Sequence, residues 1–165
     1  MGAMHRGSRL AYLISALTAT CWFAAQADGR TVLVTRVIDG DTLDVSISGR
    51  TERVRLLGID APELPHEGVP GEPFAREATA FVRRLARGQR VTLGPEPGHE
   101  DRDRYGRLLR YVTLPDGRCL NVLLVCEGYA RLFARDRLAR GDELRACEKA
   151  ARAGGRGLWS RPGPQ

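Results

Sequence analysis

Residues 31–59 read TVLVTRVIDGDTLDVSISGRTERVRLLGI, and this stretch decides the fold. Apolar residues alternate with polar ones from Leu43 to Ile47, and again at Val54 and Leu56. A period of two residues predicts strands that bury one face. The tripeptide Ser-Gly-Arg between the two runs has the composition of a hairpin turn. The stretch therefore predicts three consecutive strands.

The rest of the chain supplies the other elements of a small barrel. After a loop rich in proline and glycine, apolar residues recur every three or four positions, which predicts an amphipathic helix at 73–87. Two further strands are expected at 90–93 and 108–114, and two further helices at 120–127 and 138–153. Five strands with a helix inserted after the third form the layout of an OB-fold. We therefore predict an α+β fold, with a five-stranded OB-fold-type Greek-key β-barrel and about three α-helices.

The first 27 residues have the layout of a secretory signal peptide. Arg6 and Arg9 precede an apolar run, and Ala25 and Ala27 form an ending of small residues. The run is shorter than the about 20 residues of a membrane span, and polar residues interrupt it. We expect export of a protein that is periplasmic or secreted and has no stable membrane insertion. The expected organisation is a signal peptide at 1–27, an OB-fold domain at 28–159 and a disordered tail at 160–165.

The composition favours a polyanionic partner. The chain has 26 Lys and Arg residues against 20 Asp and Glu residues, a net charge of +6. Hydrophobic residues make up 42% and charged residues 28%, which excludes a disordered polar tract and a bundle of membrane spans.

Three cysteines lie beyond the signal segment, at Cys119, Cys126 and Cys147. Exported proteins form disulfides, so these cysteines predict one bridge and one free thiol. No C-x-x-C or Cys/His spacing is present, and His66 and His99 are the only histidines after residue 27. A zinc site is therefore not expected.

Acids and arginines alternate in four short clusters: DGDT at 39–42, Arg55, DAPE at 60–63 and DRYGR at 103–107. If the first three strands are neighbours in one sheet, Asp41 and Asp60 approach each other at one end of the barrel. Convergent oxygens without imidazole or thiolate favour a hard cation such as Ca²⁺ or Mg²⁺, and nearby arginines suit a phosphate. Each cluster alone has an ordinary structural explanation, such as a turn at Asp-Gly or a pairing of Arg55 with Glu52. Their joint order favours catalysis.

Three segments, V-I-D-G-D-T-L, R-L-L-G-I-D-A-P-E and D-R-Y-G-R, follow one another in this order, with D-G-R-x-L-N and G-L-W-S behind them. In these segments the sequence resembles the staphylococcal nuclease (thermonuclease) family, over nearly all of the chain after residue 27. A multi-part match in the right order is more specific than a single short motif. The resemblance implies a monomeric, calcium-dependent nuclease that hydrolyses phosphodiester bonds of DNA and RNA, prefers single-stranded substrate and leaves 3′-phosphate ends.

The resemblance also assigns the acidic residues. It implies that one Ca²⁺ is held by the carboxylates of Asp41 and Asp60 and by the backbone carbonyl of Ala61. Glu63 falls on the position of the carboxylate that orients or deprotonates the attacking water. Asp39 lies two residues before Asp41 and is therefore expected on the same strand face. There it is expected to support the ligands without binding the ion itself.

The basic residues receive matching roles from the resemblance. Arg55 and Arg107 fall on the two arginines that hold the phosphate and neutralise charge in the transition state. Arg104 and Tyr105 match positions that line the site for a terminal phosphate. These roles are physically reasonable, because hydrolysis adds negative charge to a group that is already anionic.

The sequence departs from the family pattern in the segment RLFARD at 131–136. A pair of tyrosines that stacks on bases in one member of the family is absent there. Phe133 and Tyr129 either substitute for this pair or fill the core.

The cysteines are a second departure from the family. The resemblance implies that the helices bearing Cys126 and Cys147 pack together. These two cysteines are therefore expected to form the bridge, and Cys119 is expected to stay reduced.

Two other functions are compatible with parts of the sequence. A non-catalytic OB-fold module could bind single-stranded nucleic acid with the same basic surface, and a disulfide-stapled envelope protein would explain the cysteines and the signal segment. The complete set of acids and arginines favours the enzyme over both.

Overall fold

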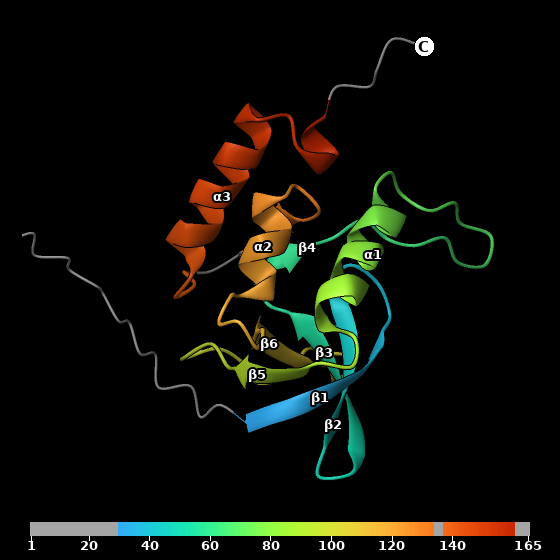
Figure 1. Ribbon diagram of the computed structural model, residues 1–165, viewed down its shortest axis with the longest axis vertical. Helices are drawn as coiled ribbons and strands as arrows, with labels where there is room; N and C mark the ends of the chain where they lie inside the picture. Colours follow the sequence, from blue (N-terminus) through green and yellow to red (C-terminus); the bar gives the residue numbers. More distant parts are fainter. Residues whose placement is uncertain (1–29, 134–136, 161–165) are drawn as a thin grey trace, which may run out of the picture.

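The computed structural model describes residues 30–133 and 137–160, and in this part of the chain five strands close a barrel (Figure 1). The strands follow one another around the barrel in the order β1-β2-β3-β6-β5. Strands β3 and β6 pair in parallel, and the other neighbours pair antiparallel. The predicted five-stranded barrel is confirmed. The strands are β1 (Arg30–Val37), β2 (Thr42–Ile47), β3 (Arg50–Leu56), β5 (Arg90–Gly94) and β6 (Leu108–Thr113).

The predicted hairpin joins β2 to β3. Ser48 and Gly49 both have positive φ angles, of 50° and 79°. A two-residue turn of this kind matches the right-handed twist of the strands that it connects. It sets the register in which Thr42 faces Arg55, so that the start of β2 lies beside the end of β3.

The described residues also form three α-helices and one short 3₁₀ helix: α1 (Ala75–Ala86), α2 (Leu120–Cys126), α3 (Gly141–Ala153) and η1 (Gly157–Trp159). Helices α1 and α2 pack on the barrel, α3 packs on α2, and η1 packs on α3. Figure 1 shows α2 beside α3 above the barrel, with α1 above β1. Helix α1 begins two residues later than the periodicity predicts, since Phe74 adopts a left-handed conformation with φ 69°. In the described part of the chain, no helix has the length and hydropathy of a membrane span.

Two very short strands were not predicted. The sequence pattern placed Asp60 at the end of the third strand, but the chain turns at Gly58, whose φ is 77°. Beyond this turn, β4 (Ile59–Asp60) pairs with β7 (Arg131–Leu132). Strands of two residues are too short to show a hydrophobic period.

Asn121 connects α2 to the barrel. Its side chain is fully buried, and its Oδ1 accepts the backbone N–H of Val112 at 3.0 Å. Its Nδ2 donates to the carbonyls of Leu57 at 2.9 Å and Arg110 at 3.1 Å. The asparagine of the D-G-R-x-L-N segment is therefore a structural residue, which holds the end of β3 under α2.

A disulfide joins Cys126 of α2 to Cys147 of α3, as the resemblance implies, and Cys119 is buried with a free thiol. The predicted signal peptide at 1–27 and residues 161–165 of the predicted tail lie outside the described residues.

Replacing both Cys126 and Cys147 with alanine is expected to lower the free energy of unfolding by about 3 kcal/mol. A bridge across 21 positions restricts the unfolded chain by about that amount. Denaturant unfolding at constant pH measures this difference. Reducing agent should destabilise the wild-type protein and the Cys119→Ala variant, but it should leave the double variant unchanged. Equal stability of the reduced and oxidised wild type would contradict the prediction.

Candidate active site

Asp41 lies buried in the turn that leads into β2, and both oxygens of its carboxyl group have partners. Oδ2 accepts the backbone N–H of Ala61 at 2.8 Å and forms an ion pair with Nη1 of Arg55 at 2.8 Å. Oδ1 accepts the hydroxyl of Thr42 at 3.1 Å. These contacts join the start of β2 to Ala61, the residue that follows Asp60. The sequence predicted that Asp41 and Asp60 approach each other at this end of the barrel.

A glycine allows this close approach. A Cβ atom on Gly40 would lie 2.7 Å from the Cβ of Ala61 and 3.0 Å from the Cβ of Ala78 in α1. Any side chain at position 40 would push these segments apart. Gly40 is therefore needed for the contact between Asp41 and Ala61.

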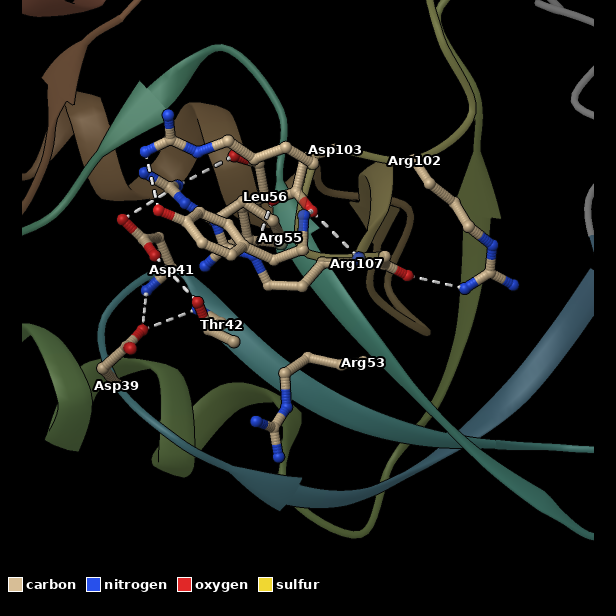
Figure 2. Close-up of polar contacts among 12 residues, drawn as sticks. Asp39, Asp41, Thr42, Arg53, Arg55, Leu56, Arg102, Asp103 and Arg107 are labelled. Carbon is tan, nitrogen blue, oxygen red and sulfur yellow. Dashed lines mark hydrogen bonds and ion pairs between the residues drawn. The ribbon is translucent and has the colours of Figure 1, made fainter.

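Asp39 has a different place from the one predicted. It lies in the turn before β2, and not on the strand, since β2 begins at Thr42. Its Oδ1 accepts the backbone N–H groups of Asp41 at 2.9 Å and Thr42 at 2.7 Å (Figure 2). A side chain that caps its own turn in this way fixes the direction of the following residue. Asp39 thus orients Asp41 through the backbone.

Arg55 joins the two aspartates among the three predicted metal ligands. Its Nη1 contacts Asp41, and its Nη2 lies 2.8 Å from Oδ1 of Asp60. The side chain of Arg55 is 15% exposed. The alternative pairing of Arg55 with Glu52 is not formed, because Glu52 pairs with Arg102 at 2.8 Å.

The two aspartates form an oxygen-rich group, the donor chemistry that hard cations prefer, and they share the Arg55 guanidinium as a partner. Both carboxylates reach the same guanidinium, so their oxygens lie close together. Burial raises the pKa of Asp41 to about 7, an effect opposed by Arg55 and increased by Asp39. A cation beside Asp41 would favour its ionised form. No group of three or more His, Cys, Asp or Glu side chains suited to a metal ion occurs among the described residues, so further ligands would be backbone carbonyls, water or substrate.

Glu63 follows these ligands in the loop before α1. Its backbone N–H donates to Oε2 of Glu72 at 3.1 Å, and the N–H of Glu72 donates to the carbonyl of Glu63 at 2.9 Å. Glu63 is exposed, but partial desolvation of its carboxyl group raises the pKa. The nearby Asp39 and Asp60 add to this increase, and Arg55 opposes it. Glu63 thus lies near enough to Asp39, Arg55 and Asp60 for their charges to act on its carboxyl group.

Asp103, for which the sequence predicted no separate role, holds the side chain of Arg107. The Nε of Arg107 donates to Oδ2 of Asp103 at 2.7 Å, and Oδ1 of Asp103 accepts the N–H groups of Tyr105 at 2.9 Å and Arg107 at 3.0 Å. Burial alone would raise the pKa of Asp103, but these hydrogen bonds and the charge of Arg107 hold it below its ordinary value. Asp103 therefore stays ionised and orients Arg107. Figure 2 shows Arg107 and Arg55 reaching the same region.

The basic residues line one cleft, which has a volume of about 500 Å³. Arg55, Arg104, Tyr105, Arg107, His99 and Phe133 are among its lining residues. Tyr105 is 67% exposed, and the guanidinium carbons of Arg104 and Arg107 lie 4.7 Å and 5.4 Å from the centre of its ring. The structure therefore brings together all four predicted substrate-contacting residues.

Aromatic residues near the cleft differ in their roles. Phe133 lines the cleft and is 53% exposed. Tyr129 packs against Phe81, with ring centres 5.0 Å apart, and belongs to the edge of the core. Of the two residues that the sequence offered as substitutes for the family's tyrosines, the cleft contains Phe133.

Comparisons with known proteins agree with this arrangement. Residues 53–161 match the family model described as "Staphylococcal nuclease homologue". The chain is 45% identical over 103 residues to a thermonuclease of Staphylococcus intermedius, which covers 62% of this chain and 60% of that relative. It is 35% identical over 137 residues to a thermonuclease of Staphylococcus hyicus, covering 82% and 79% of the two chains. An uncharacterized endonuclease of Escherichia coli is 36% identical over 131 residues, with coverage of 79% and 78%.

Proposed function

This chain belongs to the staphylococcal nuclease family, a family of phosphodiester-hydrolysing nucleases, and we propose that it is exported, depends on Ca²⁺ and cleaves both DNA and RNA to leave 3′-phosphate ends. The observation that best supports this proposal is the position of Arg55, which lines the basic cleft and contacts both Asp41 and Asp60. The names of the relatives, thermonuclease and endonuclease, support the class of reaction.

The arginines supply the positive charge that the reaction requires. Hydrolysis of a phosphodiester concentrates negative charge on a group that is already anionic, and fixed cationic donors stabilise that charge. Arg55 and Arg107 line one cleft, and each is oriented by carboxylates. In the proposed mechanism they hold the oxygens of the scissile phosphate by paired N–H donors.

Glu63 acts as the base in this mechanism. Its raised pKa makes the carboxylate a better proton acceptor than an ordinary glutamate. The reciprocal backbone and side-chain contacts with Glu72 hold the start of the loop in place. Glu63 accepts the proton of the water that attacks phosphorus, the bond from phosphorus to the 5′ oxygen breaks, and this oxygen leaves as a hydroxyl group after taking a proton from solvent.

The carboxylates of Asp41 and Asp60 and the carbonyl of Ala61 would hold one Ca²⁺. All three donors are oxygens, which hard cations prefer. When bound, the ion would supply further positive charge to the phosphate and would favour ionised Asp41.

The other residues of the cleft fit an unpaired nucleic-acid strand. Arg104 donates to the hydroxyl of Tyr105 at 2.6 Å, and this pair is suited to a terminal phosphate at the rim. Phe133 offers a ring to an unstacked base, which favours single-stranded substrate. We propose that the protein acts as a monomer.

Chelation of Ca²⁺ is expected to lower cleavage of denatured DNA and of RNA by about 10²-fold or more, because the transition state loses an electrostatic partner. Asp41→Asn should have a similar effect, whereas Asp142→Asn, an exposed substitution on α3, should not. The measurement is the initial rate of cleavage, with analysis of the product ends.

The non-catalytic OB-fold module is the alternative function. It predicts tight binding of single strands with no cleavage under any divalent metal. That result, obtained with folded protein, would contradict the proposed nuclease.

A further inference from the structure

A second basic cleft lies between β1 and α1, outside the candidate active site. Its volume is about 190 Å³, and its lining residues are Thr35, Arg36, Val37, Arg83 and Arg87. The end of α1 is joined to β1 by hydrogen bonds between backbones: Gly88 N–H to the Val34 carbonyl and Val34 N–H to the Gln89 carbonyl, each at 3.0 Å. Arg83 lies in the last turn of α1, and Arg87 is the residue directly after the helix, where the backbone becomes extended.

The three arginines of this cleft have no ion pair with an acid in the described part of the chain. Asp44 of β2 is the residue that lies opposite Arg36 of β1 in the sheet. Its carboxylate is engaged by Arg53, at 2.8 Å and 3.3 Å. Like charges gathered in one cleft repel each other, and an anion would relieve that repulsion.

Helix electrostatics explain only part of the arrangement. Arg83 lies in the last turn of α1, where a cation complements the helix dipole. Arg36 lies on a strand, so the helix dipole gives no reason for its position in the same cleft. The convergence of charges from two elements points to an anionic ligand.

The cleft is connected to the candidate active site by a row of side chains. Arg36 faces Asp44 across β1 and β2, and Asp44 faces Arg53 across β2 and β3. Arg53 shares a face of β3 with Arg55, two residues further along. A strand of nucleic acid held at Arg55 can therefore follow this face to the cleft.

We propose that the cleft formed by Arg36, Arg83 and Arg87 binds backbone phosphates of the substrate beyond the reacting nucleotides. This inference rests on the proposed function for the nature of the ligand. Guanidinium groups bind phosphate oxygens through forked N–H donors, without regard to base sequence. The cleft thus contributes to the binding of long strands and leaves the chemical step unaffected.

The test compares Arg83→Gln/Arg87→Gln with Arg118→Gln/Arg145→Gln. The control pair removes the same charge from exposed arginines that pair with Asp116 and Asp142. Binding of a long oligothymidylate is measured in chelator at several salt concentrations, so that hydrolysis is not needed. The cleft variant should bind about tenfold more weakly. The slope of log affinity against log salt should shrink by about 1.4, from two lost single-strand contacts.

Cleavage of a dinucleotide by the cleft variant should keep the wild-type rate, and Arg83→Lys/Arg87→Lys should restore most of the binding. Wild-type affinity and salt slope in the cleft variant would overturn the inference, as would an equal loss in the control pair. Failure of the proposed function can be distinguished from failure of this inference. If the protein is not a nuclease, the wild-type protein binds the strand but never cleaves it. The salt dependence of binding by the variants still decides the role of the cleft.

Discussion

Arg55→Ala is expected to lower the rate of phosphodiester hydrolysis by about 10²-fold to 10³-fold. In the proposed mechanism this side chain holds the phosphate, and loss of one preorganised donor to a developing charge has about this effect. The substitution also removes the only guanidinium that contacts both Asp41 and Asp60 in the described structure. Because the charge of Arg55 opposes the rise in the pKa of Asp41, its loss also favours protonated Asp41. Steady-state cleavage of single-stranded DNA measures the effect.

Arg55→Lys separates charge from geometry. Lysine keeps the positive charge, but its single nitrogen cannot reproduce the two contacts that Nη1 and Nη2 make. We expect this variant to lose most of the activity. Arg50→Ala, at the hairpin end of the same strand, is the matched control and should retain the wild-type rate. Wild-type activity in folded Arg55→Lys would show that charge alone is sufficient.

The barrel could be predicted because its strands are long enough to show alternation. Leu43, Val45 and Val54 are fully buried, as their period of two indicates. The pair β4 and β7 could not be predicted, because each strand has two residues and its partner lies far away in sequence. Pairing between distant segments depends on tertiary packing, which local patterns do not encode.

The approach of the acidic and basic clusters to one another was predictable, and the individual contacts were less so. The clusters around Asp41, Asp60 and Arg107 come together as their order in the sequence suggested. Asp103 lies inside the quoted D-R-Y-G-R segment, yet its role required the geometry of the turn that ends at Arg107. Glu72 lies in a loop without any period, and only the structure places its carboxylate on the N–H of Glu63.

Glu63→Gln is expected to lower the rate of hydrolysis by about 10²-fold to 10⁴-fold, the usual contribution of a general base. Glutamine keeps the size of the side chain and the backbone contacts with Glu72 but cannot accept a proton from water. Binding of single-stranded DNA in chelator should stay at the wild-type level, since the arginines of the cleft are unchanged. Single-turnover cleavage measures the chemical step separately from binding.

The neighbouring glutamates decide which carboxylate is the base. Glu67→Gln, in the same loop and exposed, should retain the wild-type rate. Glu72→Gln should cause a smaller loss than Glu63→Gln, because Glu72 contacts the backbone of Glu63 and acts on the base through that contact. The reverse order, with a large loss in Glu72→Gln and a wild-type rate in Glu63→Gln, would transfer the role of base to Glu72. Asp39 and Asp60 raise the pKa of the Glu63 carboxyl and Arg55 lowers it, so Glu63→Gln removes a carboxylate whose basicity depends on these neighbouring charges.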